Sequence, residues 1–164
     1  MSEQATRKAR PARSASRTAA RLAAVQALYQ MDMAATDANL VVREFLDHRL
    51  GDVAEKSGAE ETDFAYFKDI VLGVVKEQLK IDPVLDEHLA EGWHLSRIDS
   101  ILRAILRSAA YEITQRDDVP AKVVINEYLN IAHAFFDADE PKVVNGILDR
   151  LARAQRRNEF AQVK

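Results

Sequence analysis

Cysteine is absent from the 164-residue chain, and glycine and proline are scarce, with five and four residues. Without cysteine the chain can form no disulfide and no zinc–thiolate site, and it has no cysteine nucleophile. A β-sandwich or barrel needs a turn about every 8–12 residues, and so few breakers argue against an all-β fold.

Long apolar runs and catalytic motifs are also missing. No stretch approaches the roughly 18 apolar residues of a membrane-spanning helix, and the basic N-terminal segment lacks the apolar core of a secretory signal. The glycines form no nucleotide-binding loop, and the four histidines lack metal-ligand spacing. We therefore expect no catalytic residue, no metal and no cofactor, and predict a binding protein rather than an enzyme.

The net charge of −3 conceals a basic N-terminal arm. Residues 1–21 carry six basic residues against Glu3, a charge of +5, while the rest of the chain carries 17 basic and 25 acidic residues, a charge of −8. A basic arm on an acidic body indicates a polyanionic partner. An organelle transit peptide, which is also rich in arginine and poor in acids, stays open as an alternative.

Apolar residues recur at three- and four-residue spacing along most of the chain, which predicts helices. We expect a disordered basic arm over residues 1–15 and a helical domain over 16–160. Gly51 is expected to end the second helix, Asp82-Pro83 to begin the fourth, and Ser96 to cap the fifth. The expected helices cover residues 16–32, 39–50, 63–80, 82–92, 96–114, 120–136 and 139–157.

Arginines at positions 13, 17 and 21 are spaced to line one face of the first expected helix. We expect this face to point away from the apolar stripe and to hold phosphates, because guanidinium is always charged and offers a planar donor fork. Charge alone does not distinguish RNA from DNA or anionic lipid. Tyr29, two turns further on, is a candidate for stacking on an unpaired base and also fits a half-buried core position.

The start of the last expected helix is a second candidate site. Its N–H groups attract anions and Lys142 adds a positive charge, although Asp139 and Glu140, which helix capping explains, offset part of it. Asn145 and Gly146 each weaken a helix relative to alanine. We therefore expect a specific hydrogen bond from Asn145 and close helix packing at Gly146.

Several segments resemble, in order and spacing, the NusB family of bacterial transcription antitermination factors: residues 17–30, 63–73, 103–112, 118–127 and 142–150. The resemblance covers about residues 16–152. It implies an all-α fold of about seven helices in two perpendicular three-helix subdomains. It also implies binding of the boxA element in ribosomal RNA operon leaders, together with NusE, a ribosomal small-subunit protein. The pair joins RNA polymerase and other Nus factors in the bacterial cytoplasm.

The resemblance assigns residues to two surfaces. Together with Arg13, which comes from the arginine spacing, the RNA-binding residues are Arg17, Arg21, Tyr29, Asp139, Lys142, Val143 and Asn145. The residues for the protein partner are Ser96, Asp99, Leu102, Arg103 and Leu106. We expect Arg17→Ala and Arg21→Ala to weaken RNA binding without lowering the melting temperature. Four neutralised phosphates would give a slope of about −3 for log K against log salt.

Three departures from the family pattern affect these assignments. Thr18 and Ala19 interrupt the usual arginine run, Val143 replaces a frequent aromatic residue, and Leu102 stands where an acidic residue is common. Asp99, one turn earlier, is the candidate to substitute for that acid. Two other functions stay open: a domain of the kind fused to RNA cytosine methyltransferases, and a protein-binding adaptor or homodimer that covers its RNA face.

Overall fold

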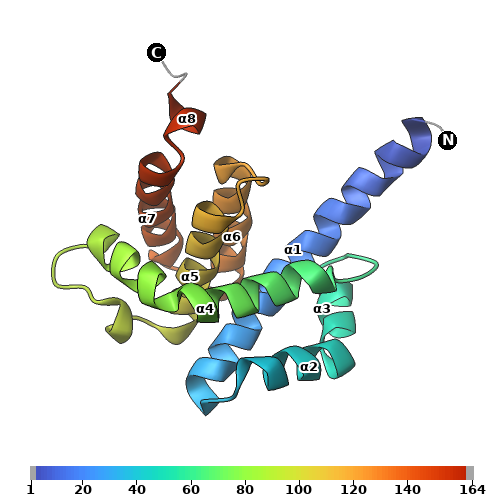
Figure 1. The fold of residues 1–164 in the computed structure, drawn as a ribbon, viewed down its shortest axis with the longest axis horizontal. Coiled ribbons are helices and arrows are strands. Elements are labelled where there is room, and N and C mark those ends of the chain that lie inside the picture. The colour runs from blue at the N-terminus through green and yellow to red at the C-terminus, as the bar shows by residue number, and fades with distance from the viewer. Residues whose placement is uncertain (1–2, 162–164) are drawn as a thin grey trace. The chain divides into compact units, whose positions relative to one another are not determined.

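The computed structural model describes the backbone of residues 3–161 and the side chains from Ala12 onward (Figure 1). Every regular element in this part of the chain is a helix, which confirms the predicted all-α class. None of these helices is both long and apolar enough to cross a membrane. The helices are α1 (Glu3–Ala34), α2 (Ala38–His48), α3 (Leu50–Lys56), α4 (Phe64–His88), the 3₁₀ helix η1 (Leu95–Arg97), α5 (Ser100–Gln115), α6 (Ala121–Phe135), α7 (Glu140–Gln155) and α8 (Arg157–Phe160).

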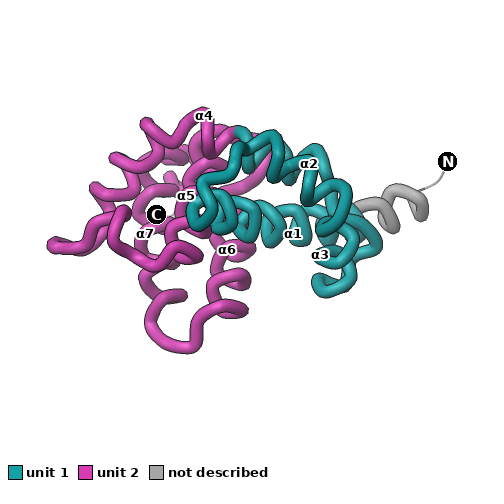
Figure 2. Tube along the Cα trace, turned by 90° about the horizontal axis from the view of Figure 1, so that it is seen from below, with its two compact units in different colours: residues 1–72 teal, residues 73–164 magenta. Residues whose placement is uncertain are grey.

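The chain forms two compact units, Met1–Leu72 and Gly73–Lys164 (Figure 2). In the first unit, α1 packs against α2 and α3, and Phe45 stacks on Phe67 with ring centroids 5.4 Å apart. In the second unit, α5, α6 and α7 pack against one another. There the buried Tyr128 hydroxyl donates to the buried Glu112 carboxylate at 2.6 Å. The perpendicular arrangement of the two subdomains stays a prediction.

Helix α1 begins well before the expected start at Ser16. It extends back to Glu3 and continues through Pro11 without a break. Alanine, arginine, lysine and glutamine dominate residues 3–15 and favour helix, so the local preference outweighs the single proline. The boundary expected at residue 16 is therefore wrong as a helix start, whereas disorder of residues 1–15 before RNA binds stays a prediction.

Two expected helix boundaries are wrong because helix-breaking residues lie on exposed surfaces. Gly51 lies in the first turn of α3 instead of ending α2, and a Cβ atom there would meet no atom within 4 Å. Pro83 lies inside α4, which runs uninterrupted past Asp82. Proline removes the hydrogen bond to the carbonyl of Leu79. The Leu79 side chain is 92% exposed, so this face of the helix is open to water, which can replace the lost donor.

Asp99, and not Ser96, caps α5. Its Oδ1 accepts hydrogen bonds from the backbone N–H groups of Ile101 and Leu102 at 2.8 and 3.1 Å. Ser96 lies three residues before Asp99, in η1. An aspartate cap satisfies N–H groups that a helix start leaves unpaired, and this position fixes where the central helix of the second unit begins.

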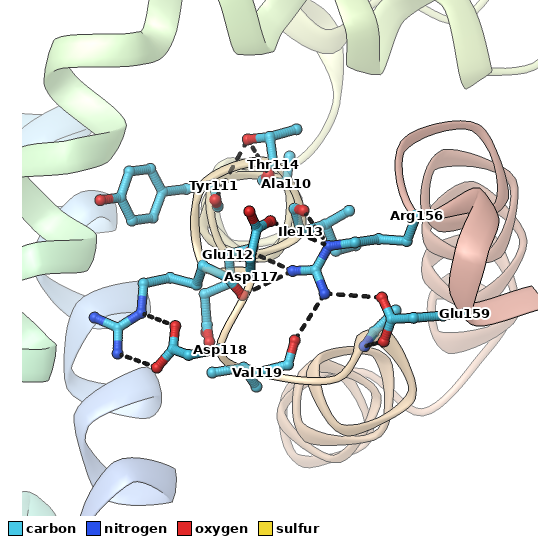
Figure 3. Close-up of polar contacts among 12 residues, drawn as sticks. Ala110, Tyr111, Glu112, Ile113, Thr114, Asp117, Asp118, Val119, Arg156 and Glu159 are labelled. Carbon is cyan, nitrogen blue, oxygen red and sulfur yellow. Dashed lines mark hydrogen bonds and ion pairs between the residues drawn. The ribbon is translucent and has the colours of Figure 1, made fainter.

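The opposite end of α5 is closed by Arg156, which lies between α7 and α8 (Figure 3). The side chain is 9% exposed. Its guanidinium forms hydrogen bonds to four backbone carbonyls and one carboxylate. It donates to the oxygens of Ile113 (2.7 Å), Val119 (2.8 Å), Arg116 (2.8 Å), Glu112 (3.1 Å) and Glu159 Oε2 (2.9 Å). These carbonyls include two of the last turn of α5, Glu112 and Ile113, and those of Glu112 and Arg116 also accept backbone N–H groups, at 2.9 and 3.1 Å. We call this arrangement the Arg156 clamp.

Glu159 joins the Arg156 clamp to the start of α6. Its Oε1 accepts from the backbone N–H of Ala121 at 2.9 Å. Burial alone would raise the pKa of Glu159, but the bonds from Ala121 and Arg156 outweigh it and hold the pKa below its ordinary value of 4.5. The carboxylate form is therefore the one that the folded protein stabilises.

We expect Glu159 to make the protein sensitive to acid. Because its pKa is lowered on folding, its stabilising effect is present above the unfolded-state pKa and is lost as pH falls through the lower, folded-state value. Glu159→Gln should therefore melt below the wild type at pH 7, and the difference should shrink steadily as pH falls below 4.5. Thermal melts across pH 3–7 measure this, with Glu55→Gln on the exposed face of α3 as the control. A difference that does not change with pH would contradict the expectation.

Candidate nucleic-acid interface

The three arginines of α1 differ strongly in exposure. Arg13 is exposed, the Arg17 side chain is 29% exposed, and Arg21 is 2% exposed. The expectation that all three form one exposed face is therefore wrong for Arg21. The reason is its contact with Tyr66, 45 residues away, which draws the guanidinium into the first unit.

Tyr66 of α4 lies at the centre of this basic cluster. The guanidinium carbons of Arg17 and Arg21 lie 4.6 and 5.0 Å from the centroid of its ring. The Nη2 atom of Arg21 donates to the Tyr66 hydroxyl at 2.8 Å. Cation–π contacts of this kind contribute about 0.5–2 kcal/mol, more where the cation is desolvated. Sequence reasoning missed Tyr66, because nothing in the local pattern of α4 distinguishes it from a core aromatic residue.

Asp63 connects the start of α4 to the same cluster. Its Oδ1 accepts from the backbone N–H of Tyr66 at 3.0 Å, and its own N–H donates to the Ser16 carbonyl at 3.1 Å. Its Oδ2 lies 3.9 Å from Nε of Arg17. One carboxylate therefore caps α4 and also approaches the inner side of the Arg17 guanidinium.

A hollow of about 560 Å³ adjoins the exposed end of the arginine row. Residues of α1 and of the loop before α4 line it: Ala12, Arg13, Ser16, Glu60, Glu61, Thr62, Asp63 and Phe64. The wall carries carboxylates beside a single arginine, so its charge is mixed. A polyanion would therefore meet the arginines along α1 rather than enter this hollow.

The contrast between Arg17 and Arg21 gives a direct test. Arg21→Ala removes a buried hydrogen bond and a cation–π contact, so it should cost about 2 kcal/mol and lower the melting temperature by about 4–8 °C. Arg17→Ala should lower the melting temperature less, by about 1–3 °C, because it removes a cation–π contact and a long, partly exposed ion pair but no hydrogen bond. Circular dichroism melts of both variants measure this. If both variants melted at the wild-type temperature, the sequence-based expectation that neither arginine supports the fold would be restored.

Tyr29 lies on the surface of α1, with 38% of the residue exposed. Helix α1 buries the alanines and Val25 that surround it in sequence. A partly exposed ring on a helix anchored in this way is available to stack on a base. Tyr29 is therefore more exposed than a half-buried core position, and its stacking on a base stays a prediction.

The predicted patch at the start of α7 is exposed. Asp139, Lys142 and Asn145 are exposed, and Val143 is half-buried. Capping does not account for the acids here, since Asp139 makes no side-chain cap bond and Glu140 Oε2 is buried without a hydrogen-bond partner among the described residues.

The two expectations about the helix-weakening residues of α7 have different outcomes. Asn145 is exposed and makes no hydrogen bond within the described residues, so its specific partner stays a prediction, whereas close packing at Gly146 is wrong. A Cβ at Gly146 would meet only the flexible end of Arg150, whose Nη1 would lie 3.3 Å away. No close helix packing therefore requires glycine at position 146.

The residues predicted for a protein partner separate into two groups. Ser96 and Asp99 are exposed, whereas Leu102 and Leu106 are buried in the second unit. The expectation that the two leucines offer a contact surface is wrong, because they lie one turn apart on the inward face of α5. Arg103 is half-buried and donates to the carbonyls of Leu95 and Ile98, so it organises the η1 segment. Asp99 is used as the α5 cap.

A model of the NusB family matches residues 18–153 of the chain. The chain is 56% identical over 144 residues to the transcription antitermination protein NusB of Bradyrhizobium sp. strain ORS 278, covering 88% of this chain and 86% of that protein. It is 49% identical over 146 residues to the protein of that name in Rhodopseudomonas palustris strain HaA2, covering 89% and 86%.

Solved structures show the same fold. NusB of T. maritima matches with a TM-score of 0.65 and 29% identity, over 88% of this chain and 96% of that one. A chain in the crystal structure of a plectonemic RNA supercoil matches with a TM-score of 0.69 and 22% identity, over 90% and 97%. At that identity the second match supports the fold alone.

Proposed function

The chain belongs to the NusB family of transcription antitermination factors, and on this premise we propose that it binds boxA RNA of ribosomal RNA operon leaders together with NusE. The bound pair joins RNA polymerase and other Nus factors in the bacterial cytoplasm and supports processive ribosomal RNA transcription. In this proposal the protein acts by recognition, without catalysis or a cofactor.

The position and contacts of the Arg17 side chain are the observation on which the proposal rests. Its guanidinium is partly exposed on a basic helix, lies over Tyr66, and has one long ion pair at Nε. Arginine forms short, charge-assisted bonds to phosphate through two parallel N–H groups. A guanidinium held over an aromatic ring, on a side chain that is 29% exposed, suits the phosphate backbone of a single-stranded RNA.

Base recognition is assigned to the uncharged residues of the two patches. Single-stranded RNA is read by stacking of splayed bases and by hydrogen bonds to their edges. Tyr29 on α1 offers the aromatic ring, and Asn145 on α7 offers an amide that can donate and accept. Lys142 supplies a phosphate contact beside Asn145, and Asp139 with Val143 borders this patch. Arg13 extends the phosphate row on α1.

Contact with NusE is assigned to the exposed residues just before α5. Ser96 of η1 and the α5 cap Asp99 present polar groups there, and Arg103 holds the η1 backbone through its bonds to Leu95 and Ile98. Leu102 and Leu106 support this surface from inside the unit. The substitution Ser96→Arg should weaken NusE binding and leave RNA binding by the free protein unchanged.

A binding titration tests the proposed function. The protein is mixed with a boxA RNA and with a scrambled RNA of equal length, each with and without NusE, at one salt concentration. We expect a preference for boxA that NusE strengthens. Equal weak binding of both RNAs would contradict the proposal and would favour an adaptor or a homodimer, which sedimentation would reveal as a mass of two 18.4 kDa chains.

The salt dependence of boxA binding should be shallower than the sequence suggests. With Arg21 buried, three cations remain for phosphates: Arg13, Arg17 and Lys142. At about 0.7 per phosphate for a single strand, the slope of log K against log salt should be about −2. Arg17→Ala should reduce its size by about 0.7, whereas Arg43→Ala, an exposed arginine of α2, should leave it unchanged. A slope near zero would rule out phosphate binding by these residues.

A further inference from the structure

We propose that Tyr66 is a positioning residue for RNA recognition, holding the Arg17 guanidinium in the orientation that receives a phosphate. The inference rests on the proposed RNA-binding function. It adds a buried residue of α4, outside both predicted patches, to the machinery that recognises RNA. Tyr66 itself is 3% exposed, so it acts through Arg17 and not by touching RNA.

The ring of Tyr66 is itself fixed in place. Its hydroxyl accepts from Nη2 of the buried Arg21 at 2.8 Å, and its backbone N–H is held by the Asp63 cap at 3.0 Å. Interior packing further limits rotation of a buried aromatic ring. The ring therefore offers a rigid surface on which the Arg17 guanidinium, 4.6 Å from its centroid, can rest.

Arg17 is constrained at two points of its guanidinium. The Tyr66 ring lies against one face, and Asp63 Oδ2 lies 3.9 Å from Nε, an atom that is buried and has no hydrogen-bond partner among the described residues. Both constraints act on the inner part of the side chain. Because Nε is buried while 29% of the side chain is exposed, the terminal Nη edge remains for a bidentate contact with a phosphate.

This arrangement affects affinity through the entropy of the arginine side chain. A free arginine has many rotamers, and fixing one of them on binding lowers the affinity. The Arg17 guanidinium is already ordered on the Tyr66 ring, so it loses less side-chain entropy when it binds a phosphate. Removing the ring should therefore weaken RNA binding about three- to fivefold, even though no RNA contact is removed.

A double-mutant cycle tests the inference. The affinity for boxA RNA is measured by fluorescence anisotropy for the wild type, Tyr66→Leu, Arg17→Ala and the double variant. We expect Tyr66→Leu to weaken binding three- to fivefold when Arg17 is present and to have no effect in the Arg17→Ala background. Phe67→Leu is the matched control: it removes a neighbouring ring from the same helix and core, away from both arginines, and should leave affinity unchanged.

If Tyr66→Leu does not fold, the conservative variant Tyr66→Phe provides the test. Tyr66→Phe keeps the ring and its volume and removes only the hydroxyl bond to Arg21. It should weaken binding less than twofold if the ring positions Arg17. Its remaining effect should again vanish in the Arg17→Ala background.

The outcomes separate this inference from the proposed function. A wild type that prefers boxA, with Tyr66→Leu binding as tightly as the wild type, would overturn the inference alone. An equal loss with and without Arg17 would also overturn it, because Tyr66 would then act through the fold. A wild type without preference for boxA would remove the proposed function and the inference together.

Discussion

Replacing Arg156 with methionine should lower the melting temperature by about 6–12 °C. The guanidinium makes five hydrogen bonds, four of them to backbone carbonyls at the end of α5 and the turn after it. Hydrogen bonds from a charged donor contribute about 1.5–3 kcal/mol each. Water can enter to replace some of them at this partly open edge, so we expect a net loss of about 3 kcal/mol. For a chain of this length that corresponds to about 2–4 °C per kcal/mol.

Arg153→Met is the matched control for the Arg156 clamp. Arg153 lies in the last turn of α7, just before Arg156; its side chain is 59% exposed, pairs with Asp149 at 3.0 Å and lies over the Phe160 ring at 4.8 Å. These exposed contacts contribute about 0.3–1 kcal/mol each, so the melting temperature should fall less than in Arg156→Met. Methionine preserves the apolar stem in both variants. If the two variants had the same melting temperature, the hydrogen bonds from Arg156 to the carbonyls would have no net effect on stability.

Gly73→Ala should be the most damaging of the glycine-to-alanine substitutions in the helices. A Cβ on Gly73 would lie 2.2 Å from Cε1 and Cζ of Tyr111 and 2.6 Å from its hydroxyl oxygen. Tyr111 is buried, so its ring must shift within a packed interior, at a cost of about 1–3 kcal/mol or more. The gain in helix preference offsets up to about 1 kcal/mol. We expect a net loss of about 2 kcal/mol, or about 4–8 °C.

Two controls, Gly146→Ala and the Tyr111→Leu background, test whether the loss in Gly73→Ala comes from the clash with Tyr111. Gly146→Ala in α7 meets only the movable end of Arg150, so it should leave stability unchanged or raise it by up to about 1 kcal/mol. In a Tyr111→Leu background the clash is relieved, and Gly73→Ala should then cost little. Denaturant unfolding of the four variants measures both effects. A Gly73→Ala protein as stable as the wild type would show that Tyr111 has room to move.

The helical class and most helix positions could be predicted because they depend on local spacing. Apolar residues at three- and four-residue intervals identify the buried faces of α5, α6 and α7, and this pattern does not depend on what the faces pack against. The helix boundaries were less predictable. Pro83 is tolerated because the helix face around Leu79 is exposed, and exposure is a property of the whole unit.

The candidate RNA site was predictable in its residues but not in their roles. The spacing of Arg13, Arg17 and Arg21 gives a common helix face, yet only contact with Tyr66 decides which of them is buried. Leu102 and Leu106 were placed on a partner surface through the family resemblance, whereas their one-turn spacing also fits the buried face of α5. The burial of Arg21 is decided by a residue 45 positions away, beyond the reach of local patterns, whereas the burial of the two leucines follows from the local apolar stripe.

The Arg156 clamp has a consequence for the newly made chain on the ribosome. The carbonyls that Arg156 bonds lie 37–44 residues before it in sequence. At about 5–20 residues per second, translation needs about 2–9 s to supply the arginine after those carbonyls are made. During this interval the last turn of the nascent α5 lacks the hydrogen bonds from Arg156. The contact between Arg21 and Tyr66 is encoded earlier, within Met1–Leu72. We therefore expect the first unit to acquire its polar contacts while the second is still incomplete.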